Sequence, residues 1–165
     1  MSLQDELLEL AAKVHDELLT RGLTIAIAES CTGGLASSLI TDLDGSSEVL
    51  PFSLVTYSAD AKEEFLGIPP YIIRDFGTIS LECVKLMAEG LLDYEVDIGL
   101  ATTGVIGESI EGKLKGTAHV AVAVAGQKTF AKDLTLDPNK TRIELKQEIV
   151  KNLFEVLIFA IDSIF

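Results

Sequence analysis

Short apolar runs alternate with longer amphipathic segments along the first hundred residues, and this alternation restricts the fold more than any other feature. Leu23–Ala28 (LTIAIA) and Val96–Thr102 are nearly continuous apolar runs. Runs of this length are typical of strands that are buried on both faces, and they are too short to span a bilayer. Apolar residues also recur at helical spacing in Leu3–Arg21, which is followed by the stop signal Gly22. The sequence therefore predicts an α/β fold.

The same signals predict the remaining elements, and no internal repeat or linker divides the chain. They indicate helices at Gly33–Asp42, Ala59–Leu66, Leu81–Leu92 and from Asn139 onward, strands at Leu54–Tyr57, Gly116–Ala125 and Lys128–Leu136, and an extended connection at Pro69-Pro70. We expect one domain over residues 1–165, a three-layer α/β/α arrangement with a mixed, partly parallel sheet and an antiparallel hairpin near residues 116–136.

The charge balance limits the partners of the chain. The 165 residues carry a formal net charge of −13, and no cluster of five or more Lys or Arg residues occurs. Such a surface repels phosphate backbones, so we expect no nucleic-acid partner. A small anionic ligand is still compatible, because a pocket can be locally positive inside an acidic shell. We also expect no membrane partner and a cytoplasmic location, since Met1–Glu6 carries acids where a signal peptide carries bases.

The residues that usually bind metals are isolated from one another. Cys31 and Cys83 are far apart and show no ligand spacing, and neither His15 nor His119 has a metal-binding neighbour in the sequence. We therefore expect free thiols, no metal site and no cofactor.

Three turns rich in polar residues and glycine follow three of the predicted strands. They are Ala28–Gly34 (AESCTGG), Thr56–Lys62 (TYSADAK) and Thr102–Gly107 (TTGVIG). In the first turn, backbone amides at a helix start suit either a phosphate or the oxyanion of an acyl transfer. The alternative is that Ser30 or Thr32 only caps the helix. Ligand sites in open α/β sheets lie at strand ends, so convergence of the three turns favours a site.

A hydroxyl nucleophile at such a site needs a base, and no histidine lies near the predicted turns. Lys62 is a candidate, because lysine acts as a base when desolvation lowers its pKa; otherwise it is a solvated helix charge. Tyr57 fits either the core or the rim of the site. Cys31 is either a nucleophile or a small packing residue. Glu29 is suited to fixing a backbone amide in the turn, or to steering a substrate cation.

Five motifs in order resemble one family. AESCTGG, Val55–Lys62 (VTYSADAK), Gly77–Ser80 (GTIS), Thr103–Gly107 (TGVIG) and Gly116-Thr117 are similar to the motifs of the C-terminal domain of the competence/damage-inducible protein CinA. Members of that family act as nicotinamide-nucleotide amidohydrolases, or nicotinamide mononucleotide deamidases. The resemblance covers nearly the whole chain. It implies the stand-alone form of the domain, and a homodimer or higher homo-oligomer.

The resemblance implies hydrolysis of the carboxamide of nicotinamide mononucleotide, giving nicotinate mononucleotide and ammonia without a metal. It implies that Ser30 is the nucleophile, that Lys62 is the base, and that Tyr57 assists. The binding residues that it implies for the nucleotide substrate are Thr32, Gly33, Gly34, Thr103, Gly104, Arg142 and, on weaker grounds, Lys113.

The chain departs from the family pattern in the fourth motif, Thr103–Gly107. A TGIAGP-like motif is typical there, whereas this chain has TGVIGE, so Ile106 replaces an alanine and Glu108 replaces a proline. A carboxylate close to a bound phosphate is repulsive unless it points away. The altered loop keeps a second function open, namely a divergent nucleotide-binding module without turnover.

Overall fold

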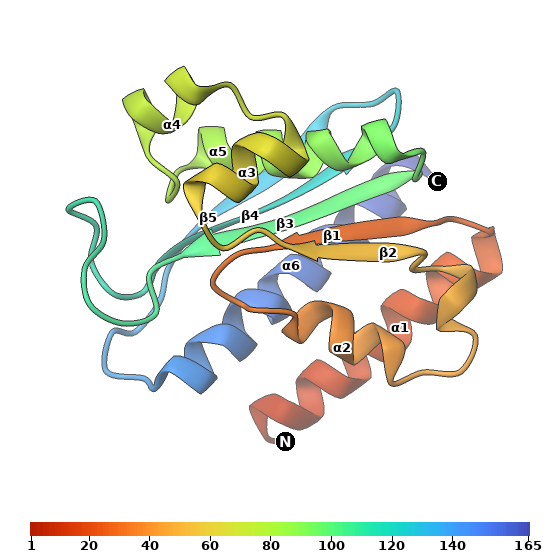
Figure 1. Ribbon diagram of the computed structural model, residues 1–165. Helices are drawn as coiled ribbons and strands as arrows, with labels where there is room; N and C mark the ends of the chain where they lie inside the picture. Colours follow the sequence, from red (N-terminus) through yellow and green to blue (C-terminus); the bar gives the residue numbers. More distant parts are fainter.

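The computed structural model describes residues 1–165 as one five-stranded sheet between two layers of helices (Figure 1). The helices are α1 (Leu3–Arg21), α2 (Leu35–Thr41), α3 (Ala59–Leu66), α4 (Pro70–Phe76), α5 (Leu81–Gly90) and α6 (Arg142–Ile164), with the 3₁₀ turns η1 (Ser46–Glu48) and η2 (Leu91–Tyr94). The strands are β1 (Ile25–Glu29), β2 (Phe52–Val55), β3 (Ile98–Gly104), β4 (Thr117–Val124) and β5 (Thr129–Thr135). No helix is both long enough and apolar enough to cross a membrane.

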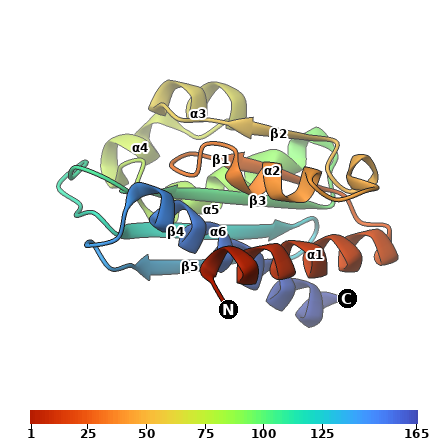
Figure 2. The same cartoon turned by 90° about the horizontal axis from the view of Figure 1, so that it is seen from below.

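The sheet is mixed, and its strand order is β2-β1-β3-β4-β5 (Figure 2). β1 pairs in parallel with both β2 and β3, whereas β4 is antiparallel to β3 and to β5. The carboxyl ends of β1, β2 and β3 therefore lie at one edge. β5 ends at the same edge, so α6 also begins there. The predicted three-layer α/β/α fold with its antiparallel hairpin is confirmed.

The two faces of the sheet carry side chains of different size. Along β1, Ile25 and Ile27 face the layer of α1, α2 and α6, while Ala26 and Ala28 face the layer that contains α5. β3 and β4 repeat this alternation of large and small residues. A side chain at Gly99 would overlap the carbonyl oxygen of Ala88 in α5. The small residues thus allow the backbone of α5 to lie close against the sheet.

Several predicted boundaries are wrong. Pro69-Pro70 does not lead into an extended connection, because Pro70 begins α4; the fixed φ of proline suits the first position of a helix. α2 begins only at Leu35, because Gly33 and Gly34 adopt positive φ values of 61° and 107°. α6 starts after the capping residue Thr141 and not at Asn139.

The other predicted elements are present, with shifts at their ends. The helices predicted at Leu3–Arg21 and Ala59–Leu66 have the predicted bounds. The predicted helix Leu81–Leu92 divides into α5 and η2, and the strands β1, β2 and β3 lie within two residues of their predicted ends.

Candidate active site

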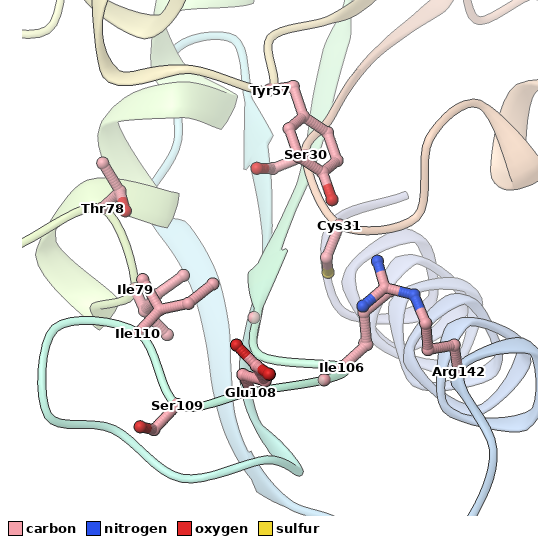
Figure 3. A pocket seen from close by; sticks show the side chains of 12 residues that line it. Ser30, Cys31, Tyr57, Thr78, Ile79, Ile106, Glu108, Ser109, Ile110 and Arg142 are labelled. Atoms are coloured by element: carbon pink, nitrogen blue, oxygen red, sulfur yellow. The ribbon is translucent and has the colours of Figure 1, made fainter.

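The turns that follow β1, β2 and β3 meet at the shared edge of the sheet and line a cavity of about 500 Å³ (Figure 3). The start of α6 and the loop of residues 107–110 complete its wall. The lining residues are Ser30, Cys31, Tyr57, Thr78, Ile79, Gly104, Ile106, Gly107, Glu108, Ser109, Ile110 and Arg142.

Ser30 and Lys62 contact each other at this cavity. The Lys62 Nζ atom lies 2.9 Å from Ser30 Oγ, 2.7 Å from the carbonyl oxygen of Thr56 and 3.2 Å from that of Tyr57. Ser58 caps α3 by accepting a hydrogen bond from the Ala61 amide, so Lys62 lies in the first turn of the helix. Helical side chains lean toward the amino end of their helix, which directs this amine back to the end of β2.

The amine of Lys62 is buried without a carboxylate partner. Lys62 is only 1% exposed, and this desolvation lowers its pKa, because burial disfavours the charged form. Burial also raises the pKa of Cys31 to about 12 and that of Cys83 to about 11. Both thiols are therefore protonated at neutral pH and supply no negative charge that would keep Lys62 protonated.

The three contacts of the amine fit both protonation states of Lys62, because three acceptor oxygens also match the three hydrogens of an ammonium group. A neutral Lys62 has two hydrogens and one lone pair. Lys62 Nζ is placed to donate to Ser30 Oγ as well as to the carbonyl oxygens of Thr56 and Tyr57. When the amine is neutral, its two hydrogens can stay with the carbonyl oxygens, and its lone pair can accept the hydrogen of Ser30 Oγ. In this protonation state, Lys62 can take a proton from Ser30.

Glu29 fixes the turn that carries Ser30. Its side chain is completely buried and accepts four hydrogen bonds, from the backbone amides of Ala36 and Ser37 and from the hydroxyls of Thr32 and Ser37, at 2.7–3.0 Å. Four donors match the acceptor sites of an ionised carboxylate. Glu29 thus connects the end of β1 to the first turn of α2. Of the two roles considered for this residue, the structure shows the one in which it fixes backbone amides.

A directed chain of hydrogen bonds runs from Glu29 to the backbone of Ser30. Thr32 Oγ1 gives its only hydrogen to Glu29, so Thr102 Oγ1, 2.9 Å away, donates to Thr32. The Ser30 amide then donates to Thr102 Oγ1 at 3.3 Å. The amide of Ser30 is therefore occupied, whereas the amides of Cys31, Thr32 and Gly34 donate no hydrogen bond within the chain.

Two cations that form no ion pair lie beside this turn. The guanidinium group of Arg142 lies over Gly107, where a Cβ atom would come within 2.5 Å of Nη1. Lys146, one helical turn further along α6, places its Nζ atom 3.6 Å from where a Cβ atom of Gly33 would lie. Neither has a carboxylate oxygen within 4.0 Å. Sequence reasoning missed Lys146, although its spacing of four residues from Arg142 indicates a shared helix face.

Three of the predicted binding residues hold the walls and do not line the cavity. The hydroxyl of Thr32 is buried against Glu29. Thr103 donates to the carbonyl oxygen of Thr78 at 2.7 Å. Lys113 donates to the carbonyl oxygens of Phe76 and Ile79.

The glycines and Tyr57 have different placements. Gly104 lines the cavity, whereas Gly33 and Gly34 lie in the turn just behind Cys31. Tyr57 is 60% exposed, so it does not belong to the core. Its ring lies at the mouth of the cavity beside Ser30 (Figure 3).

The comparisons with known proteins agree with this fold. The family model of the CinA C-terminal domain matches residues 7–160. The chain belongs to this family. A CinA-like protein of Shewanella sp. (strain ANA-3) is 38% identical over 136 residues, which cover 81% of this chain and 32% of that protein. A competence-damage inducible protein of Caldanaerobacter subterraneus subsp. tengcongensis is 40% identical over 144 residues, covering 86% of this chain and 34% of that protein.

The chain thus spans about a third of the length of these relatives. Solved structures of the family cover nearly all of it. The crystal structure of the competence/damage inducible protein CihA from Agrobacterium tumefaciens superposes with a TM-score of 0.89 at 30% identity, over 95% of this chain and 96% of that chain. A competence or damage-inducible protein from Enterobacter asburiae gives 0.88 at 27% identity, over 94% and 98%.

The loop that follows the fourth motif is bound to the loop before α5. The Glu111 carboxylate accepts hydrogen bonds from the amide and the hydroxyl of Thr78 at 2.9 and 2.8 Å and from the Ile79 amide at 3.1 Å. Glu111 has φ 55° and precedes Gly112, so a tight turn aims the carboxylate back at that loop. No periodic pattern in the sequence indicates this contact.

The site contains no cluster for a metal. No group of three or more His, Cys, Asp or Glu side chains in the chain is arranged to hold a metal ion.

Replacing Glu29 with glutamine should destabilise the fold strongly. Each carboxylate oxygen of Glu29 accepts two hydrogen bonds. In either orientation, the side-chain NH₂ group of a glutamine would face two of these donors, which would then have no acceptor. We expect the free energy of unfolding, measured by urea denaturation, to fall by about 2–4 kcal/mol. The control Glu48→Gln removes the same charge from an exposed residue without hydrogen bonds and should leave stability within about 0.5 kcal/mol. Equal stability of the two variants would show that the Glu29 contacts contribute little.

Proposed function

We propose that this chain is a serine–lysine amidohydrolase that converts nicotinamide mononucleotide and water to nicotinate mononucleotide and ammonia. The observation that carries the proposal is the 2.9 Å contact between Ser30 Oγ and a buried, uncompensated Lys62 amine at the wall of a cavity. A nucleophile in contact with a base of lowered pKa is the arrangement that covalent acyl transfer requires.

The first half of the proposed reaction forms an acyl-enzyme. Neutral Lys62 takes the hydroxyl hydrogen as Ser30 Oγ bonds to the carboxamide carbon. The backbone amides of Cys31 and Thr32 donate no hydrogen bond within the chain and are the proposed donors for the oxyanion, because the amide of Ser30 is bound to Thr102. Protonated Lys62 then gives its proton to the departing nitrogen, the carbon–nitrogen bond breaks, and ammonia leaves.

The second half hydrolyses the ester. Lys62, neutral again, removes a proton from a water molecule that attacks the acyl carbon. Collapse of this second intermediate returns the proton to Ser30 Oγ and releases the carboxylate product. One base thus serves both halves, by microscopic reversibility.

The shape and charge of the cavity support a nucleotide substrate. Its volume of about 500 Å³ falls in the range of small-molecule sites. Ile79, Ile106 and Ile110 supply an apolar wall for a ring, and Tyr57 lies at the mouth. Arg142 and Lys146 form no ion pairs and lie on one side, where they are suited to a phosphate.

The proposed reaction predicts loss of ammonia release when either member of the pair is changed. The unaltered protein should release ammonia from nicotinamide mononucleotide, and Ser30→Ala and Lys62→Met should each lower kcat on the order of a thousandfold or more. Ser38→Ala, an exposed serine of α2, is the control and should keep full activity. Normal turnover by both site variants would refute the mechanism. Binding of the mononucleotide by the unaltered protein without ammonia release would instead support a nucleotide-binding module.

The lowered pKa of Lys62 predicts a rising pH profile. Only the neutral amine acts as a base, so kcat/KM should increase as the pH rises through the pKa of Lys62 and level off below the range in which an exposed lysine titrates. The free energy of unfolding should rise over the interval between this lowered pKa and the usual lysine value, because there the unfolded state binds more protons. Lys62→Arg, which stays protonated, should remove the rising limb. A rate that does not vary with pH would contradict the assignment of Lys62 as the base.

The two cations on α6 predict a phosphate-dependent change in KM. Arg142→Gln and Lys146→Gln should each raise KM for nicotinamide mononucleotide by about tenfold, because each removes a charge-assisted hydrogen bond. KM for nicotinamide riboside, which lacks the phosphate, should stay nearly constant. Lys151→Gln removes a charge from the same helix at a residue that pairs with Glu6 of α1, and it should change neither value. Equal effects on both substrates would exclude a phosphate contact.

A further inference from the structure

Glu108 places an unpaired carboxylate at the exposed rim of the candidate site. It lines the cavity together with Ser30 and Arg142. Its carboxylate and the Arg142 guanidinium group both point into the space below Ser30 and Cys31 (Figure 3). Glu108 accepts no hydrogen bond from the chain, and no basic nitrogen lies within 4.0 Å of its oxygens. The cavity therefore presents a cation and an anion that do not neutralise each other.

The backbone that carries Glu108 is held in place. The loop beyond it is latched to the segment before α5 by Glu111, whose carboxylate bonds to Thr78 and Ile79, and by Lys113. The bridge between Ile110 and Lys113 closes the loop on itself. Glu108 thus projects from a fixed wall of the cavity that Ser30 also lines.

A free carboxylate at this position changes which ligands fit. Near a phosphate alone it is repulsive, and near a neutral aromatic amide it contributes nothing by charge. The one class of carboxamide ligand that matches both charges carries a fixed cation beside the amide and an anion further away. A pyridinium nucleotide has this pattern, because its ring nitrogen is quaternary and its 5′-phosphate is anionic.

We infer that Glu108 is a specificity-determining residue that makes the site prefer carboxamides on a cationic pyridinium ring over carboxamides on a neutral ring. The inference rests on the proposed function, since it assumes that the amide lies against Ser30. In this geometry the carboxylate of Glu108 faces the positive ring while Arg142 and Lys146 face the phosphate. The two ends of the ligand are therefore distinguished by charge, and this orients the amide toward Ser30.

The test is a binding comparison in which turnover is absent. Ser30→Ala and the double variant Ser30→Ala, Glu108→Gln are titrated by calorimetry with nicotinamide mononucleotide and with the 5′-monophosphate of benzamide riboside, whose ring is neutral. With Glu108 present, the cationic ligand should bind about 3–10-fold more tightly than the neutral one, the range of a partly solvated charge pair. With glutamine, the ratio should approach one. The control Ser30→Ala, Glu48→Gln, changed at the opposite edge of the sheet, should keep the preference.

Two results would overturn the inference while leaving the proposed function intact. One is the same ratio with and without the Glu108 carboxylate. The other is equal weakening of both ligands, which would assign Glu108 to the ribose hydroxyls that both share. Failure of the proposed function is distinct, because the unaltered protein would then release no ammonia from nicotinamide mononucleotide, whatever the binding ratio of the Ser30→Ala variants.

Discussion

The arrangement of the site depends on one buried amine that has no counter-ion. Burying a charged ammonium group is costly unless it is paired, and Lys62 has carbonyl oxygens and a hydroxyl as partners instead of a carboxylate. A carboxylate at this place would hold Lys62 in its charged form and remove its value as a base. The backbone carbonyl oxygens of Thr56 and Tyr57, just after β2, accept hydrogen bonds from the amine. They thus reduce the cost of its burial without adding a negative charge that would raise its pKa.

The fold brings this amine to Ser30 through the unequal faces of the sheet. Alanine and glycine on one face let α5 lie close to the strands, and Gly90 of α5 in turn admits the backbone of α3 at Leu66. The first turn of α3 carries Lys62, whose amine contacts Ser30 at the end of β1. The neighbouring end of β3 contributes Thr102, which accepts the Ser30 amide. The buried Glu29 carboxylate orders the same turn from behind. Ser30 is therefore held by groups that lie outside the cavity, and the cavity itself is left open for a ligand.

Local sequence signals predicted the parts of the structure that local forces determine. The bounds of α3 follow from the Ser58 cap and the Gly67 stop, and the meeting of three strand ends follows from their parallel pairing. The sequence did not reveal the partners of Thr32 and Lys113, because hydroxyl and amine groups suit a ligand and a backbone carbonyl equally well. Lys146 was missed for a related reason. Lys146 lies beside Gly33 only because α6 packs next to the turn that follows β1. That packing depends on the arrangement of the whole sheet, which local sequence patterns do not reveal.

The distribution of charge in this acidic chain is compatible with the anionic nucleotide of the proposed function. Acidic residues outnumber basic ones by 26 to 13, and Arg21, Arg74, Lys113, Lys140 and Lys151 lie in ion pairs. Arg142 and Lys146 do not, although they belong to the same helix as Lys140's partner Glu148 and Lys151. An unpaired cation on an acidic surface produces a positive potential around it only where the neighbouring carboxylates already accept hydrogen bonds from other groups. Glu29 and Glu111 are engaged, by backbone amides and hydroxyls, and Glu108 is not. The cavity therefore has unpaired positive charge on the side of α6 and unpaired negative charge at the loop of residues 107–110. This distribution is complementary to a ligand whose anionic tail lies toward α6 and whose cationic ring lies toward the loop.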